Sequence, residues 1–196
     1  MRSKAIFLDR DGTLNEMVYN ENHGIFDSPM LPSQLKVIAG STDLVNRAKE
    51  LGYKVIIISN QPGIAKGTLT IENLKAINNK LLTIIGIDKI DDIFFCPHHP
   101  DGLLDPQSKY IFDCECRKPK PGMLLEAAKK HDIELSNSWM IGDGITDVQA
   151  GVAAGCKTML IANIKVEHLA MLEKKSVWPE IIVPNIYGAI NHLNSL

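Results

Sequence analysis

The chain contains 196 residues, of which 45% are hydrophobic and 22% are charged, and its formal net charge is -2. These values are typical of one soluble globular domain with a sizeable core, and they give no sign of the basic surface that nucleic acid or an anionic membrane would attract. No apolar stretch approaches the ~20 residues of a membrane span. We therefore expect a single cytoplasmic domain over residues 1–196, a monomer that binds neither nucleic acid nor membrane.

The first predicted element is the apolar run Ala5-Ile6-Phe7-Leu8, which indicates a fully buried strand within residues 4–8. It is followed directly by Asp9-Arg10-Asp11-Gly12-Thr13, so two carboxylates one residue apart emerge where the strand ends. A polar loop of about residues 15–36 comes next. Because long loops over the end of a sheet often contact ligands, we expect this one to be a substrate loop.

Strands and helices alternate along the remainder of the chain. Apolar spacing and capping residues predict strands at about 54–58, 92–96, 138–141, 158–162 and 181–183 and helices at about 41–51, 121–131, 147–154, 164–173 and 187–193. Thr70 caps a further helix, whose expected buried side is Leu74, Ile77, Leu81 and Ile84. This order is typical of an α/β fold, a Rossmann-like, doubly wound and mainly parallel sheet with helices on both faces.

Chemically reactive side chains follow several of these strands. They are Asp9 and Asp11, Ser59 and Asn60, Lys118 just before a helix, and Asp143 with Asp147. Because the strand ends of a doubly wound sheet converge on one crevice, we expect these residues to form a single site. The set suits a phosphate ester, whose negative charge must be neutralised before a carboxylate can approach it, and Mg2+ does this mainly through carboxylates.

Some of these strand-end residues are expected to bind the metal and others the phosphate. Asp9 and Asp143 are predicted magnesium ligands, with the backbone carbonyl of Asp11 as a third oxygen. Asp147 is either a further ligand or a helix cap. Lys118 supplies a second positive charge. The predicted phosphate-binding groups are Ser59 with its neighbour Asn60, and the free N–H groups after the first two strands.

The two acids of the first motif have different expected roles. Asp9 is the predicted nucleophile, which forms an aspartyl-phosphate, and Asp11 is the predicted general acid and base. The acid role requires a pKa of Asp11 above its reference value of about 3.9, and we expect burial and the neighbouring acid to raise it. Taken singly, an acid after a strand is most often a turn or cap residue, and Lys118 alone would be a surface lysine. Four motifs in order are difficult to explain in that way.

This set, in this order, resembles the haloacid dehalogenase (HAD) superfamily of phosphatases over about residues 4–162. The segment that begins at Asp9 matches the one that carries the nucleophile and the acid/base residue in that superfamily. Ser59 matches the hydroxyl of the second motif and Lys118 the lysine of the third, while Gly142-Asp143 with Asp147 matches the fourth. The resemblance implies a HAD-like fold and a magnesium-dependent phosphatase.

Cysteine is concentrated before the helix predicted at 121–131. Cys96-Pro97-His98 and Cys114-Glu115-Cys116 form two short pairs, and three thiolates with one imidazole make a closed tetrahedral zinc site. We therefore predict a structural zinc ion in a loop of about residues 96–116, with Cys96, His98, Cys114 and Cys116 as ligands. His99 is an alternative to His98, and reduced cysteines or a disulfide are the alternative to a metal. Cys156 is expected to be a small core residue.

The cysteine loop narrows the resemblance to the D-glycero-D-manno-heptose 1,7-bisphosphate phosphatase family. Cys-Pro-His-His-Pro from residue 96 and Cys-x-Cys-Arg-Lys-Pro from residue 114 are similar to that family, and histidinol-phosphate phosphatases share the loop. The resemblance implies a compact chain without a large cap domain, a contact between Arg117 and substrate, and removal of the 7-phosphate of the sugar bisphosphate.

The loop of residues 15–36 departs from the usual pattern of this family and leaves the substrate open. A sugar bisphosphate needs a second basic contact, and the candidates are Lys66, Arg117 and Lys120. Histidinol phosphate carries an amine and would favour nearby acids such as Glu21 or Asp27. A non-catalytic protein that binds a phosphorylated ligand is a third alternative, and it would be expected to lack a motif residue, whereas none is lacking.

Overall fold

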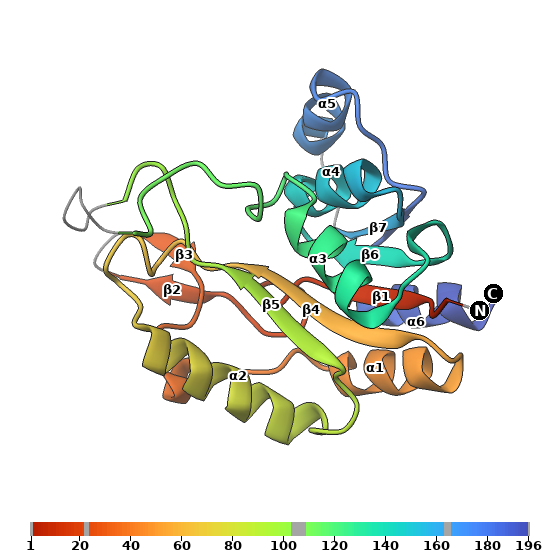
Figure 1. Ribbon diagram of the computed structural model, residues 1–196, viewed down its shortest axis with the longest axis horizontal. Coiled ribbons are helices and arrows are strands. Elements are labelled where there is room, and N and C mark those ends of the chain that lie inside the picture. Colours follow the sequence, from red (N-terminus) through yellow and green to blue (C-terminus); the bar gives the residue numbers. More distant parts are fainter. Residues whose placement is uncertain (1, 22–23, 103–108, 163–165, 196) are drawn as a thin grey trace.

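A computed structural model of the chain describes residues 2–21, 24–102, 109–162 and 166–195. Its central feature is a parallel sheet with the strand order β5-β4-β1-β6-β7-β8 (Figure 1). The strands are β1 (Ala5–Leu8), β4 (Lys54–Asn60), β5 (Asp92–Cys96), β6 (Trp139–Gly142), β7 (Lys157–Ile161) and β8 (Ile181–Val183). Since β1 lies between β4 and β6, the order reverses at the centre of the sheet, and the doubly wound α/β prediction is confirmed.

Helices cover both faces of this sheet (Figure 1). On one face lie α1 (Ser41–Glu50), α2 (Ile71–Ile85) and α6 (Ile186–Asn194), which pack on Ile6 and Leu8 of β1. On the other lie α3 (Gly122–His131) and α4 (Ile145–Ala154), which pack on Ala5 and Phe7. The side chains of β1 alternate between the two cores and all are buried, which explains its continuous apolar sequence. Outside α4, Leu172 of α5 (Val166–Lys174) contacts Val148 and Leu160.

The segment expected to be a polar substrate loop, residues 15–36, contains a small antiparallel hairpin. Its strands are β2 (Val18–Asn20) and β3 (Ile25–Asp27), and the short 3-10 helix η1 (Pro32–Gln34) follows. The rings of Tyr19 and Phe26 pair across the hairpin with centroids 5.2 Å apart. The prediction missed these strands because their side chains are partly or fully exposed, so they lack the apolar alternation of a core strand.

Three further boundaries differ from expectation. Strand β4 continues to Asn60, so Ser59 and Asn60 belong to the strand rather than following it. Helix α4 begins at Ile145, which puts Asp147 in its first turn. The buried side of α2 ends with Ile85, 1% exposed, whereas Ile84 is 47% exposed, so the assignment of Ile84 was wrong.

Helix α5 matches the helix expected at 164–173 from residue 166 onward, since residues 163–165 lie outside the described part of the chain. Within the described residues, every helix is too short or too polar to cross a membrane.

Candidate active site

Three acids expected at one site do lie together at the carboxyl ends of β1 and β6. Asp9 follows β1, Asp143 follows β6, and Asp147 comes from the first turn of α4. One carboxylate oxygen from each lies within 4.8 Å of one from both others. Asp9 and Asp143 border an open cavity of about 260 Å3. The neighbouring positions of β1 and β6 in the sheet therefore bring together residues that are distant in sequence.

Lys118 lies at the centre of this acid cluster and is 3% exposed. Its Nζ is 2.6 Å from Asp9 Oδ1 and 2.6 Å from Asp147 Oδ1, and it donates to the carbonyl of Ile58 at 2.8 Å. Burial lowers the pKa of Lys118, but the negative charges of Asp147 and Asp9 raise it by more. The net shift of the pKa is therefore upward, and the amine stays charged.

Asn60 holds the backbone that carries this lysine. Its side chain donates to the carbonyl of Lys118 at 3.0 Å and accepts from the N–H of Lys118 at 3.1 Å. Because both ends of the carboxamide are engaged, the end of β4 is tied to residue 118, 58 positions later in the chain. Asn60 also borders the catalytic cavity, next to Asp9 and Asp143.

The charges of the cluster do not balance. Burial raises the pKa of Asp9 well above its usual value; Lys118 opposes this shift, while the other acids add to it. Burial also raises the pKa of Asp143, and Asp147 adds to the effect. One lysine among three acids leaves an excess of negative charge, so the oxygen donors fit a divalent cation such as Mg2+.

Two glycines allow this close approach of acidic side chains. Gly12 has a φ of +91°, and a Cβ there would overlap the carboxylate of Asp143. A Cβ at Gly142 would overlap the carboxylate of Asp147. Around them, Thr13 Oγ1 donates to Asp143 at 3.3 Å and the N–H of Gly144 donates to Asp147 Oδ2 at 2.9 Å. The glycines therefore supply space as well as turns.

Asp11 lies apart from this acid cluster and has its own hydrogen-bond partners. Its Oδ1 accepts from Arg10 Nε at 3.1 Å and from Asn15 at 3.0 Å, while Oδ2 accepts from Arg10 Nη2 at 2.9 Å and from Gln61 at 2.7 Å. Burial raises the pKa of Asp11, but the charge of Arg10 and the hydrogen bonds from these residues lower it, and the net shift is downward. The expectation of a raised pKa was wrong because it did not consider these donors.

Ser59 and Arg117 lie on different sides of the site. The Ser59 hydroxyl is buried, accepts from Gln61 at 2.8 Å and lies 3.5 Å from Asp11 Oδ2. Arg117 donates to the carbonyl of His98 at 3.4 Å and borders a second cavity of about 270 Å3. This basic cavity is lined by His99, Arg117, Lys118 and Lys120, but also by Asp101 and by Asp113, which pairs with Lys120 at 2.8 Å. Since Lys118 borders both cavities, the basic cavity adjoins the catalytic one.

The four predicted zinc ligands also lie together, between β5 and α3. Cys96 Sγ is 3.4 Å from Cys114 Sγ and 3.2 Å from Cys116 Sγ, and the Nδ1 atom of His98 lies 3.3 Å from Cys116 Sγ. A tetrahedral zinc with bonds of about 2.3 Å would separate its sulfur ligands by roughly 3.7 Å. Small outward movements of the thiols would therefore make room for the ion.

The structure distinguishes the four predicted zinc ligands from the alternatives of His99 and a disulfide. His99 Nδ1 accepts from the N–H of Asp101 at 3.0 Å, and His98 rather than His99 belongs to the cluster. All four cysteines are free thiols. Burial raises the pKa values of Cys96 and Cys116, so their thiolates require a cation nearby. The donor set fits a closed zinc site, and buried Cys156 lies outside it.

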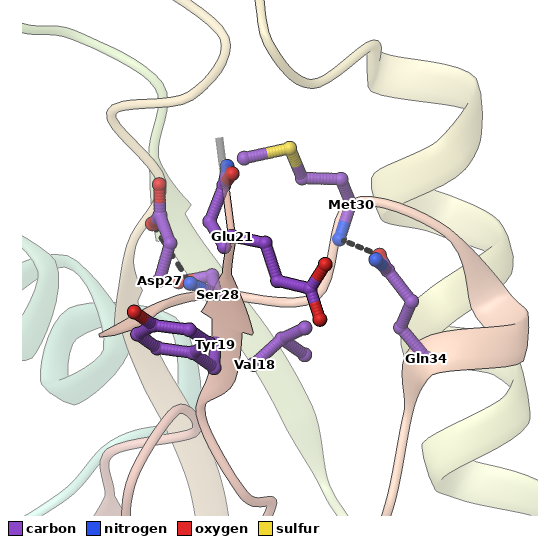
Figure 2. Close-up of a pocket in the computed structure, with 8 residues that line it drawn as sticks. Val18, Tyr19, Glu21, Asp27, Ser28, Met30 and Gln34 are labelled. Carbon is purple, nitrogen blue, oxygen red and sulfur yellow. Dashed lines mark hydrogen bonds between the residues drawn. The ribbon is translucent and has the colours of Figure 1, made fainter. Parts of the chain in front are cut away.

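A third cavity, of about 320 Å3, lies beside the β2–β3 hairpin (Figure 2). Figure 2 shows the carboxylate of Glu21 pointing toward the space between Met30 and Gln34. Asp27 and Ser28 border both this cavity and the catalytic one. Among its described lining residues, Glu21 and Asp27 are acidic and none is basic, whereas the cavity beside Arg117 carries charges of both signs.

Sequence reasoning missed four residues of the hydrogen-bond network around Asp11. Arg10 had no predicted role, yet it is fully buried and donates to both oxygens of Asp11, and buried Asn15 donates to one of them. Gln61 and Asn78, which contact Asp11 and Arg10 respectively, are also buried. Asn78 did offer a signal, since it is a polar residue on the apolar side of a predicted helix.

Comparisons with known proteins identify similar chains. Residues 115–189 match the family model described as HAD-hydrolase-like. The chain is 39% identical over 162 residues to the D-glycero-beta-D-manno-heptose-1,7-bisphosphate 7-phosphatase of Yersinia pestis, covering 81% of this chain and 80% of that protein. It is 41% identical over 155 residues to the D-glycero-alpha-D-manno-heptose-1,7-bisphosphate 7-phosphatase of Photorhabdus laumondii, covering 78% of each.

A solved structure agrees with these relatives. The D,D-heptose 1,7-bisphosphate phosphatase from B. bronchiseptica, complexed with magnesium and phosphate, superimposes with a TM-score of 0.75 at 29% identity and covers 98% of both chains.

Proposed function

The chain belongs to the D-glycero-D-manno-heptose-1,7-bisphosphate 7-phosphatase family of HAD-like hydrolases, and from this premise we propose that it removes the 7-phosphate of such a sugar bisphosphate. The enzyme class is phosphatase. The observation that carries the proposal is the pairing of the strand-end acid cluster with Lys118, in a chain about 40% identical to phosphatases acting on that substrate.

Asp9 is the nucleophile in this proposal. Its carboxylate attacks phosphorus, an aspartyl-phosphate forms and the sugar oxygen leaves. Lys118, 2.6 Å from Asp9, neutralises the charge of the phosphate and of the nucleophile. Asp9, the carbonyl of Asp11 and Asp143 would hold Mg2+, with Asp147 as a further ligand or as the partner that orients Lys118. When bound, Mg2+ supplies the positive charge that lets an anionic nucleophile approach an anionic ester.

Asp11 is the acid and base of the same reaction. In its observed position both carboxylate oxygens accept hydrogen bonds, which suits the base that takes a proton from water in the second half of the reaction. To protonate the leaving oxygen first, Asp11 has to give up some of these bonds when substrate binds. Ser59, whose hydroxyl lies beside Asp11, completes the phosphate site, whereas the carboxamide of Asn60 supports that site through the backbone of Lys118.

The second phosphate of the substrate belongs in the basic cavity. Arg117 and Lys120 border that cavity, and Lys118 connects it to the catalytic one. A ligand with two phosphates would therefore meet Lys118 at one end and Arg117 at the other, while Lys120 is paired with Asp113 and Glu115. The zinc ion proposed at Cys96, His98, Cys114 and Cys116 would hold the loop that carries Arg117 and Lys118, because Cys116 immediately precedes them.

One observation favours a second candidate, histidinol phosphate. Glu21 and Asp27 border the hairpin cavity, and such a cavity would favour an amine over a second phosphate. Both candidates use the same chemistry at Asp9, so only the group far from the reacting phosphate distinguishes them.

A substrate panel tests the proposal. Phosphate release is measured for both anomers of D-glycero-D-manno-heptose 1,7-bisphosphate, for their 1-phosphates and for histidinol phosphate, with Mg2+ present. We expect the largest kcat/KM for a bisphosphate and retention of the 1-phosphate in the product. Arg117→Ala should lower kcat/KM for the bisphosphate by about tenfold or more and affect histidinol phosphate less. A larger kcat/KM for histidinol phosphate would overturn the substrate assignment.

A further inference from the structure

Arg10 is the bulkiest side chain that is fully buried in the described part of the chain. Its guanidinium has partners on two sides. Nε and Nη2 donate to the two oxygens of Asp11 at 3.1 and 2.9 Å, and Nη1 donates to Asn78 Oδ1 at 2.7 Å. A buried arginine is strongly destabilising unless its charge and its donors are matched, so this arrangement fixes both the position and the plane of the guanidinium.

Asn78 connects this arginine to helix α2. It is 8% exposed and lies among Leu74, Ile77 and Leu81, on the side of the helix that packs against the sheet. A carboxamide in an apolar interface needs a partner, and Asn78 finds it in Arg10, 68 residues earlier in the chain. The packing of α2 therefore sets where Asn78 lies, and Asn78 in turn sets where Arg10 lies.

The opposite side of Asp11 is also occupied. Gln61 donates to Oδ2 at 2.7 Å and Asn15 donates to Oδ1 at 3.0 Å, so donors surround the carboxylate from several directions. Arg10 makes contact with both oxygens at once, which fixes the rotation of the carboxylate. These contacts fix both the position and the rotation of the Asp11 carboxylate.

We propose that Asn78 and Arg10 are positioning residues that hold Asp11 as the general base for hydrolysis of the aspartyl-phosphate. The inference rests on the proposed function and assigns the geometry of one step within it. In that step the oxygen of water bonds to phosphorus while the bond from phosphorus to the Asp9 oxygen breaks. Its electron pair returns to the Asp9 carboxylate, and the water proton passes to Asp11, where it is available for the leaving oxygen of the next turnover.

The two half-reactions can be measured separately with p-nitrophenyl phosphate. Its leaving group needs no acid, so kcat/KM reports formation of the aspartyl-phosphate without a contribution from Asp11, whereas kcat includes the hydrolysis step. The variants are Asn78→Leu, which removes the acceptor at similar volume, its matched control Asn78→Asp, which keeps the acceptor, and Arg10→Met. Acid-quenched protein is analysed for covalently bound phosphate during turnover.

We expect Arg10→Met to lower kcat about 100-fold, as for loss of a general base. Asn78→Leu should lower kcat about tenfold, as for loss of one buried hydrogen bond to a charged group. In both, kcat/KM for p-nitrophenyl phosphate should stay within about threefold of wild type and the phosphorylated fraction should rise, since only the second step is slowed. Asn78→Asp should retain the wild-type kcat.

Equal losses of kcat and kcat/KM would overturn the inference, because they indicate fewer active molecules rather than a slower step. Unchanged kcat in Asn78→Leu would overturn it as well. If Arg10→Met does not fold, Asn78→Leu and Asn78→Asp decide the question on their own. A wild-type enzyme that never carries phosphate on Asp9 would instead refute the proposed chemistry, and this control is measured before the variants.

Discussion

The acid cluster and the cysteine cluster both gather metal-binding side chains, but they are built differently. Asp9, Asp143 and Asp147 belong to strand ends and a helix start, they include Lys118 as a counter-charge, and they border an open cavity. In the cysteine cluster the donor atoms point at one another. Its members are Cys96, His98, Cys114 and Cys116. The first arrangement leaves room for a substrate, and the second does not.

The surrounding backbone explains the difference. The acid cluster is held by the hydrogen bonds between β1 and β6. They continue to the cluster itself, because the N–H of Asp9 donates to the carbonyl of Ile141 at 2.9 Å, and none of them depends on a metal. In the cysteine cluster, Cys96 ends β5, but the other three members lie in residues 97–102 and 109–121, which contain no helix or strand in the described chain. We therefore expect a metal to serve chemistry in the first region and folding in the second.

The largest effect should come from Asp9→Asn. Removing the nucleophile should lower kcat by about 10⁴-fold or more, as for other enzymes that act through a covalent intermediate. Zinc content by elemental analysis and the unfolding midpoint should stay close to wild type, because Asn can still accept a hydrogen bond from Lys118, which also stays paired with Asp147. Residual turnover comparable to wild type would refute the nucleophile assignment, and loss of zinc would show that the two regions are not separate.

Cys114→Ser should have the reverse pattern, with stability as the main loss. We expect zinc content to fall from about one per chain to near zero and the free energy of unfolding to fall by about 3 kcal/mol, the stabilisation expected when a ligand is present at several hundred times its Kd. Activity should fall only through displacement of Arg117 and Lys118. Cys156→Ser is the matched control: Cys156 is also buried but lies outside the cluster, so zinc content should not change. Full zinc content in Cys114→Ser would contradict the site.

Asn60→Ala tests whether the two regions are independent, because Asn60 bonds to the backbone of Lys118, between them. It removes two hydrogen bonds to the backbone of Lys118, which lies two positions after Cys116. Looser placement of the lysine should lower kcat about tenfold, as expected for about 1.4 kcal/mol of lost positioning. Zinc content should be unchanged. A larger loss of zinc than of kcat would show that Asn60 supports the cysteine loop rather than Lys118.

The smallest effect should come from a polar contact remote from both regions. Asp91 accepts from the N–H of Val55 at 2.7 Å and from Lys49 Nζ at 2.8 Å. Burial raises the pKa of Asp91, but the hydrogen bonds from Lys49 and Val55 lower it by more. The folded-state pKa therefore lies below the unfolded value. The carboxylate therefore stabilises the fold above pH ~4, and this contribution is lost as the pH falls through the folded-state pKa.

Asp91→Asn should lower the free energy of unfolding by about 0.5 kcal/mol at pH 7, the discounted value of a partly exposed ion pair, with activity and zinc content unchanged. Denaturant titrations at pH 7 and pH 3 should show that the difference from wild type shrinks at the lower pH. A difference that grows on acidification would mean that the sign of the Asp91 pKa shift is wrong.

Much of this protein could be read from residue types and their order. The apolar run before Asp9, the alternation of strands and helices and the two cysteine pairs predicted a doubly wound α/β fold and a cluster of Cys96, His98, Cys114 and Cys116. These features are local or periodic, so they are visible without coordinates. The placement of Asp9, Asp143 and Lys118 in one site followed from a general rule about strand ends.

Only the tertiary structure decided which side chains contact Asp11. The charge and hydrogen bonds of Arg10, with hydrogen bonds from Asn15 and from Gln61, 50 residues after Asp11, reverse the expected direction of the Asp11 pKa shift. Arg10 is the neighbour of Asp11 in sequence, but only the fold shows that its guanidinium is buried against that carboxylate, where Asn78 accepts from it. The exposed hairpin after residue 15 was likewise invisible to apolar periodicity. The physical reason is that a pKa depends on donors and charges a few ångströms away in space, whereas a sequence pattern reports only which residues face the core.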